Sequence, residues 1–149
     1  MYLTKRHYVK NWDHNPKEQH YKITVKQGGK KCTSVDTAKI NSIIEDVHYW
    51  RKANAIHKWF VDHVQDGNDD CKKYYVGQEY LKELLADINT VLTDHSKAEE
   101  VLPHTAGFFF GGDEYDEWYF IDLEETKKTL EAELSIENNK ADYYYQSSW

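Results

Sequence analysis

The segment Tyr49-Trp-Arg-Lys-Ala-Asn-Ala-Ile-His-Lys-Trp-Phe60 decides how the centre of this chain is interpreted. It lies within a longer apolar stripe that has the three–four spacing of a helix face packed on a core. The stripe consists of Ile40, Ile43, Val47, Trp50, Asn54, His57, Val61 and Val64. This spacing predicts a long helix from Thr37 to about Gln65, with Asp36 as its N-cap and Gly67 just beyond its end.

The middle of this stripe is polar, which is unusual for a buried helix face. Asn54 and His57 occupy it, and a buried polar group without a partner costs about 1–3 kcal/mol. In one interpretation this region is a ligand pocket, in which His57 binds a ligand or transfers a proton. In the other, His57 is a structural core residue, hydrogen-bonded to a backbone carbonyl or to a tyrosine of the sheet. The structural interpretation is favoured, because a single histidine on an apolar face is more often structural than catalytic. The candidate pocket residues are Trp50, Arg51, Asn54 and His57.

Strand patterns occur at both ends of the chain. The alternation from Tyr2 to Val9 predicts a first strand. Tyr21 to Lys26 alternates as well, and Gln27-Gly-Gly-Lys30 is typical of a tight hairpin turn leading into Lys31 to Thr33, since glycine adopts the positive φ angles that such turns require. The aromatic segment at 142–149 predicts a final strand.

Helical patterns fill most of the remaining chain. Helices are predicted from Gln78 to about Thr93 and from Asp116 to Leu134, with a short helical turn from Ser96 to Leu102 that stops at Pro103. With the central helix, these make three main helices. The fold class is therefore predicted to be α+β, in which a small antiparallel sheet from the N-terminal strands and the C-terminal strand packs against three main helices.

The chain has 149 residues, which is the length of a single domain. We divide this domain, residues 1–149, into a basic N-terminal β arm (1–33), a helical body (36–135) and a C-terminal strand (142–149). Residues 1–31 contain eight Lys or Arg and two acidic residues, whereas the rest of the chain has a net charge of −13. Either the basic arm packs on the acidic body, which is favoured, or one of these regions binds a charged partner.

Aromatic residues make up 15% of the chain, with twelve Tyr and five Trp, a composition typical of half-buried and interface positions. A phenylalanine triplet between glycines precedes a run of acidic residues. This pattern indicates a patch suited to a protein partner or to imitation of a nucleic-acid backbone. In the alternative, which is favoured for the triplet, the phenylalanines fill the core and the acids stabilise the start of the next helix. The candidate partner-binding residues are Phe108, Phe109, Phe110, Asp113, Glu114, Asp116 and Glu117.

No metal and no cofactor is expected. The histidines lack the i, i+4 pairing of a zinc helix, and the two cysteines form no CxxC pair. An acidic loop resembles a calcium-binding loop at its first, third and fifth positions, Asp66, Asn68 and Asp70. However, Cys71 and Gly77 stand where such a loop requires a glycine and a bidentate glutamate. No nucleophile motif is present, so enzymatic activity is uncertain and a non-enzymatic role is favoured.

Several segments together resemble a family of small uncharacterised proteins of tailed bacteriophages and prophages. They are Tyr8-Val-Lys-Asn-Trp-Asp-His14, Tyr49 to Phe60, Val64-Gln-Asp-Gly67 with Asp69-Asp-Cys71, Gly107-Phe-Phe-Phe-Gly111 with Glu114-Tyr-Asp116, and Tyr143 to Trp149. The resemblance covers nearly the whole chain. It implies a phage origin and a host-cytoplasmic location, but no mechanism.

These observations lead to one main functional hypothesis and two alternatives. The main hypothesis is a phage accessory protein that acts without catalysis by binding a host or phage macromolecule, with a protein as the expected partner. The expected outcome is inhibition or redirection of a host system, for example a nuclease, a defence complex or a transcription component. The first alternative is a small enzyme or ligand sensor that uses the Asn54/His57 pocket. The second is nucleic-acid binding through the basic arm with Tyr2, Tyr8 and Trp12, which the net charge of −7 disfavours. No apolar run is long enough to cross a membrane.

Overall fold

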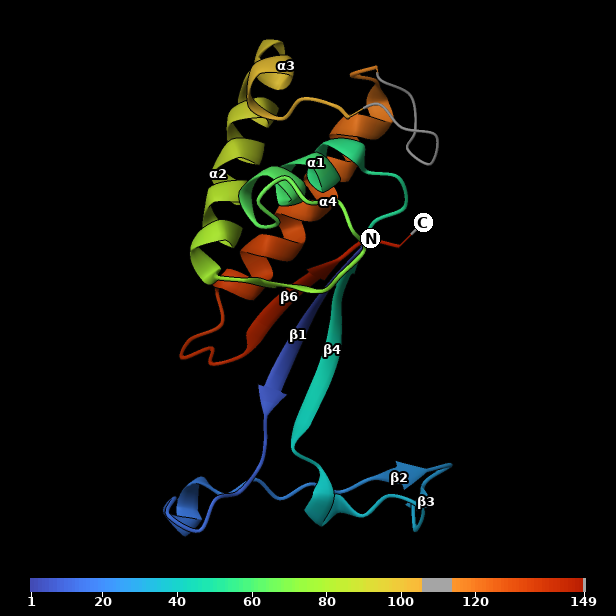
Figure 1. Cartoon of the computed structure of the whole chain (residues 1–149), viewed down its shortest axis with the longest axis vertical. Helices are drawn as coiled ribbons and strands as arrows, with labels where there is room; N and C mark the ends of the chain where they lie inside the picture. The colour runs from blue at the N-terminus through green and yellow to red at the C-terminus, as the bar shows by residue number, and fades with distance from the viewer. Residues whose placement is uncertain (106–113, 149) are drawn as a thin grey trace.

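The computed structural model describes residues 1–105 and 114–148 and has an α+β architecture, as predicted. Its main sheet is antiparallel throughout, and its four strands lie in the order β4, β1, β6, β5. The strands are β1 (Tyr2–Tyr8), β4 (Ser42–Tyr49), β5 (Tyr74–Val76) and β6 (Asp142–Gln146). The helices are α1 (Asn54–His63), α2 (Gln78–Thr93), α3 (Ala98–Val101) and α4 (Glu117–Leu134). Figure 1 shows all four helices gathered at one end of the molecule.

The predicted long helix from Thr37 to Gln65 is wrong. A short 3-10 helix (Thr37–Lys39), the strand β4 and the ten-residue helix α1 replace it. Asp36 is a cap, as predicted, but it caps only the 3-10 helix, where it accepts a hydrogen bond from the backbone N–H of Ala38. The β-branched residues of β4 favour a strand, and pairing with β1 satisfies its backbone groups. The predicted helical body is therefore interrupted by two strands, β4 and β5.

Most of the other predicted elements are confirmed, but the strand predicted from Tyr21 to Lys26 is wrong, because residues 21–25 are loop and only Lys26 belongs to a strand. Helix α2 has the predicted bounds, and α4 begins after Asp116, whose side chain accepts a hydrogen bond from the N–H of Tyr119 at 3.0 Å. The predicted hairpin turn is present between two very short strands, β2 (Lys26–Gln27) and β3 (Lys30–Lys31). Gly28 and Gly29 have φ angles of 56° and 79° there, which is the geometry of a type I′ turn.

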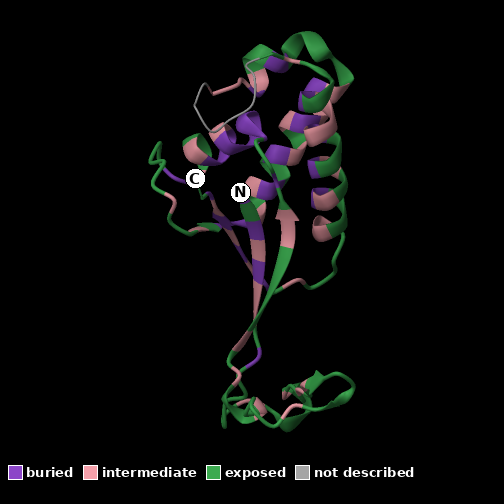
Figure 2. Ribbon diagram, turned by 90° about the vertical axis from the view of Figure 1, so that its right-hand side faces the viewer, coloured by how far each residue is buried: buried purple, intermediate pink, exposed green. Residues whose placement is uncertain are grey.

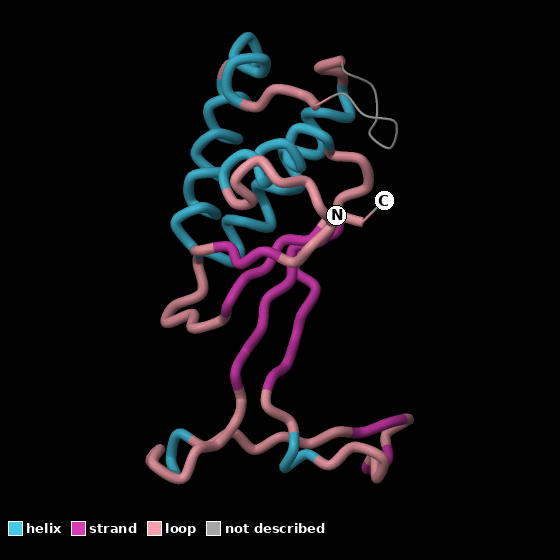
Figure 3. Tube along the Cα trace, viewed as in Figure 1, coloured by secondary structure: helices cyan, strands magenta, loops and turns pink. Residues whose placement is uncertain are grey.

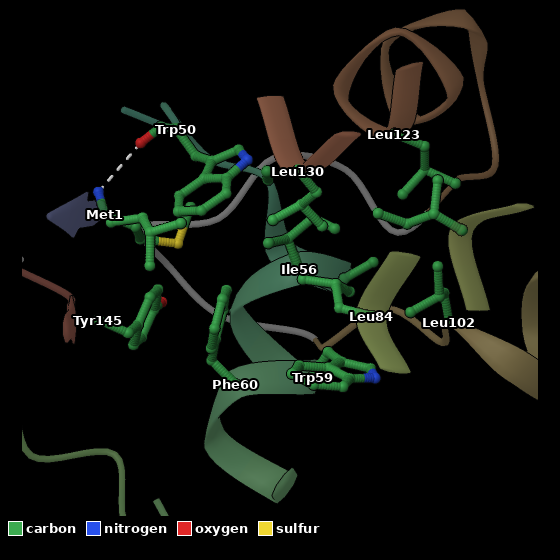
Figure 4. Packing of buried hydrophobic residues seen from close by; sticks show 14 of the residues in the cluster. Met1, Trp50, Ile56, Trp59, Phe60, Leu84, Leu102, Leu123, Leu130 and Tyr145 are labelled. Atoms are coloured by element: carbon green, nitrogen blue, oxygen red, sulfur yellow. Dashed lines mark hydrogen bonds between the residues drawn. The ribbon is translucent and has the colours of Figure 1, made fainter. Parts of the chain in front are cut away.

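The core lies between the helices and one face of the sheet. Figure 4 shows Phe60 of α1 next to Tyr145 of β6, and the two rings stack with their centroids 4.1 Å apart. Leu84 of α2 and Leu130 of α4 are fully buried in the same cluster. In β1, the alternate residues Leu3 and Lys5 face this core. Burial of one face therefore holds the sheet and the helices together.

Beyond the helices, β1 and β4 continue as a two-stranded stalk (Figure 1). Residues 10–41, which we call the distal tip, connect the two strands. Figure 3 shows that most of the distal tip is loop, and no residue within it is buried. Figure 2 shows the same contrast between a partly buried body and an exposed tip.

Candidate functional site

His57, the central residue of the sequence-based pocket hypothesis, lies in the core and is 1% exposed. Its Nε2 lies 3.1 Å from Oδ2 of Asp69, and its Nδ1 lies 2.7 Å from the hydroxyl of Tyr145. A carboxylate only accepts hydrogen bonds, so Nε2 carries the proton and Nδ1 accepts from the tyrosine. This confirms the expected hydrogen bond to a tyrosine of the sheet. The side chain ties α1 to β6 and to the loop that follows α1.

Burial lowers the pKa of His57, although the hydrogen bond and the negative charge of Asp69 oppose this effect. The folded protein therefore keeps His57 neutral at a pH where the unfolded chain, with a pKa of about 6.5, binds a proton. The stability contributed by neutral His57 is present above pH 6.5 and is lost as the pH falls towards the folded-state pKa.

We expect His57→Ala to lower the free energy of unfolding by about 1–3 kcal/mol at pH 7.5, because it leaves a cavity and removes the partner of two polar groups. The variant is also expected to lose less stability than the wild type between pH 7 and pH 5. Urea unfolding at several pH values measures both effects. An equally stable variant that has lost a biological activity would instead support a ligand-binding or catalytic His57.

The remaining sequence-predicted pocket residues separate in the structure. Trp50 is buried in the core, and its Nε1 donates a hydrogen bond to Oγ1 of Thr126 at 2.8 Å. Arg51 and Asn54, in contrast, line a pocket of about 260 Å³ between the start of α1 and the start of α4. Nδ1 of His104 donates to Oδ1 of Asn54 at 2.6 Å at this pocket. The polar pocket therefore exists, but without His57 or Trp50 in its lining.

The same pocket includes part of the predicted acidic patch. Glu114 and Asp116 line it, whereas Glu117 is exposed on α4 and does not. Phe108, Phe109, Phe110 and Asp113 lie outside the described residues. The pocket thus combines two groups of candidates that the sequence placed in separate sites.

Several lining residues were missed by sequence reasoning, and Asp122 of α4 is the most informative of them. Burial raises the pKa of Asp122 to about 6, with a further contribution from the carboxylates of Glu125 and Asp116. Within the described part of the chain, its carboxylate has neither a hydrogen-bond donor nor an ion-pair partner. The sequence signal for Asp122 is its position three residues after the buried Tyr119, since residues at this spacing share one face of a helix.

A second candidate region is the face of the sheet that points away from the core, which we call the open face. Tyrosines from four strands lie on it, and most are more than 40% exposed. Ring contacts join Tyr2 to Tyr49 at 5.1 Å and Tyr75 to Tyr144 at 5.9 Å between ring centroids. The described helices make none of their hydrogen bonds or ring contacts with these side chains. The tyrosines of the open face are Tyr2, Tyr8, Tyr49, Tyr75 and Tyr144.

Arg6 lies at the centre of this open face. Its guanidinium contacts the rings of Tyr8 and Tyr144 at 4.5 and 4.9 Å, and it is paired with Asp142 at 3.3 Å. Arg6 also donates a hydrogen bond to the hydroxyl of Tyr144. Tyrosine and arginine are the residue types enriched at protein–protein contacts.

The distal tip, at the end of the stalk, differs in net charge from the chain as a whole. It contains seven lysines, no arginine and three acidic residues, so its net charge is +4 within a chain of net charge −7. The ammonium of Lys10 lies 4.0 Å from the ring centroid of Trp12, which is exposed. Among the described residues, the favoured expectation that the basic arm packs on the acidic body holds for Lys5, which pairs with Glu133 and Glu45, and for Arg6, which pairs with Asp142, but for no lysine of the distal tip.

The distance from the body makes the tip an independent positive region. Five residues of extended chain separate Lys5, which pairs with Glu133, from Lys10, or roughly 17 Å at about 3.3 Å per residue. This is about twice the Debye length of roughly 8 Å at physiological ionic strength. The acidic body therefore hardly reduces the attraction of the tip for an anionic surface.

Among residues 1–105 and 114–148, no group of three or more His, Cys, Asp or Glu side chains could hold a metal ion. None of the helices in the described chain combines the length and hydropathy needed to cross a membrane. No protein-family model, curated protein or solved structure matches this chain. The geometry of the chain defines it as a small α+β protein with an open tyrosine-rich sheet face and a basic distal tip.

Proposed function

We propose that this chain is a phage accessory protein that acts in the host cytoplasm by binding another protein, without catalysing a reaction. The phage origin and the location follow from the sequence resemblance. The observation that carries the binding role is the open face, where five tyrosines and Arg6 are presented to solvent by four strands. Large amphipathic side chains on a rigid sheet provide contact area at a low cost in conformational entropy.

The distal tip supports this role and indicates the charge of the partner. It continues from the open face along the stalk, and none of its side chains is buried. Its seven lysines favour an acidic surface on the partner. The contact would thus combine tyrosine packing at the sheet with electrostatic attraction at the tip.

A protein fits these features better than a nucleic acid does. On the open face, Asp46 and Asp142 balance Arg6 and Lys73, so the face has no excess of positive charge. A nucleic acid is a long polyanion whose affinity depends on many phosphate contacts. A strand bound at the tip and running along the stalk would approach the acidic body, which would repel it. The distal tip also lacks arginine, the residue that recognises phosphate in the bidentate manner.

Two variants test this proposal against the wild type in pull-downs from host lysate. In the first, Tyr8, Tyr49 and Tyr75 are replaced by threonine, which keeps strand propensity but removes the rings. In the second, residues 10–40 are replaced by Asn-Gly, because the N–H of Val9 already donates to the carbonyl of Asn41 at 3.0 Å and a two-residue turn can close this hairpin. Both variants are expected to lose at least about 90% of the captured protein, a loss of roughly 1.4 kcal/mol or more.

The control variant is Lys82→Gln/Glu83→Gln, which changes two exposed residues of α2, on a helix and not on the sheet that carries the open face. All variants are first compared by thermal unfolding, where we expect the melting temperature of the body to be retained. Undiminished capture by the threonine variant would refute a role of the open face. Capture that disappears after nuclease treatment, or sub-micromolar binding to duplex DNA at physiological salt, would instead favour the nucleic-acid alternative.

A further inference from the structure

The pocket between α1 and α4 contains opposite charges that do not neutralise each other. Arg51 lines it at the end that leads into α1, while Glu114, Asp116 and Asp122 come from α4 and the residues just before it. Within the described chain, no ion pair joins Arg51 to any of these carboxylates. Both kinds of charge therefore line the same small volume without an ion pair between them among the described residues.

The first turn of α1 adds to the positive side of the pocket. Ala53, Asn54, Ala55 and Ile56 all contribute to the lining, and the N-cap residue Ala53 provides no side-chain cap. The first N–H groups of a helix have no acceptor within the helix, and they lie at the positive end of its dipole. A carboxylate is the group that this arrangement favours, and Arg51 can add a bidentate hydrogen bond to it.

The negative side of the pocket favours an ammonium group. Asp116 already accepts the capping hydrogen bond from Tyr119, whereas the carboxylate of Asp122 has no hydrogen-bond donor among the described residues. The charge of Asp122 is opposed by burial and by neighbouring carboxylates. Keeping such a charge costs stability, which is a common feature of groups that serve a ligand.

We propose that this pocket binds a free α-amino acid with an apolar side chain, with its carboxylate at the first turn of α1 and Arg51 and its ammonium at Asp122. The volume of about 260 Å³ suits a molecule the size of leucine. Trp118, Tyr119 and Leu123 provide an apolar wall for the side chain. This inference concerns a different region from the open face and does not depend on the proposed protein partner.

Isothermal titration calorimetry of the full chain with three matched ligands tests this proposal. L-Leucine has both charges, leucinamide lacks the carboxylate, and N-acetyl-leucine lacks the ammonium. We expect L-leucine to bind and each derivative to bind about 10- to 100-fold more weakly, because each loses a charged hydrogen-bonding group. Equal binding of leucinamide, equal binding of N-acetyl-leucine, or no binding of L-leucine would each overturn the proposal.

Two single substitutions test which residue binds the carboxylate of the ligand and which binds its ammonium. Arg51→Gln should weaken L-leucine binding and reduce the preference for L-leucine over leucinamide, while Asp122→Asn should reduce the preference over N-acetyl-leucine. Asp122→Asn should also raise the melting temperature at pH 8, since it removes a charge that the fold disfavours, so that weaker binding cannot be ascribed to unfolding. Lys82→Gln/Glu83→Gln again serves as the control. Unchanged ligand preference in both pocket variants would refute the assignment.

Discussion

Replacement of Trp50 by alanine is expected to lower the free energy of unfolding by about 3–5 kcal/mol, the range for removal of a large buried aromatic side chain. Trp50 is 2% exposed. Its ring contacts Phe60 and Tyr145 at 5.8 and 6.3 Å between centroids, and its loss also leaves Oγ1 of Thr126 without this donor. Figure 4 shows Trp50 beside Met1, whose amino group donates to the carbonyl of Trp50 at 3.0 Å. Urea unfolding followed by circular dichroism measures the effect.

The matched control is Trp118→Ala, because Trp118 is 72% exposed on α4 and surface substitutions usually change stability by less than about 0.5 kcal/mol. Comparing the two tryptophans separates the loss of buried packing at Trp50 from the general effect of removing an indole ring. A change of less than about 1 kcal/mol in Trp50→Ala would contradict the packing described here.

The second large effect is expected at Glu133 of α4. Lys5 of β1 is 8% exposed, and its ammonium lies 3.2 Å from Oε1 of Glu133. Burial alone would lower the pKa of Lys5, but the hydrogen bonds and charges of Glu133 and Glu45 outweigh it and raise that pKa. The hydroxyl of Tyr143 donates to Glu133 at 2.7 Å as well. We expect Glu133→Ala to lower the free energy of unfolding by about 3–5 kcal/mol, because it leaves a buried ammonium without its main partner.

Two further variants distinguish this mechanism from a general effect on α4. Glu131→Ala removes an exposed glutamate that pairs with Lys127 at 3.8 Å, and it should change stability by less than about 0.5 kcal/mol. The double substitution Lys5→Met/Glu133→Leu removes both charges and should recover most of the loss. If the double variant were as unstable as Glu133→Ala, the unpaired charge would not be the cause. Chemical unfolding of all three variants at pH 7.5 provides the comparison.

Much of the fold could be predicted from the chain itself where the signals are local. Helix α2 repeats leucine and isoleucine at regular helical spacing, and α4 begins with the capping residue Asp116, so both were predicted with nearly correct bounds. Gly28 and Gly29 specified their turn because few other residues accept positive φ at both positions. Helix propensity, capping and turn geometry act over only a few residues.

The central segment was misinterpreted because its local signals are ambiguous. Ile43 and Val47 fit helical spacing, but their β-branched side chains fit a strand equally well. Pairing with β1, whose residues lie 34 to 47 positions before their partners (Tyr8 with Ser42, Tyr2 with Tyr49), decided the outcome. Ile43 of this stripe is 41% exposed on β4, whereas Val47 and Trp50 pack on the core, so the stripe does not form one continuous buried face.

Local sequence alone therefore determined the fold class, the two longest helices and the hairpin turn. It also predicted that His57 is a hydrogen-bonded core residue. Only the tertiary structure brought Arg51 and Asn54 together with Asp122, which lies more than sixty residues later in the chain. It also decided that five tyrosines would share one open face, since the side of the sheet on which a residue lies depends on strand register. Contacts between distant residues depend on packing of the whole chain, and spacing within a single segment does not encode them.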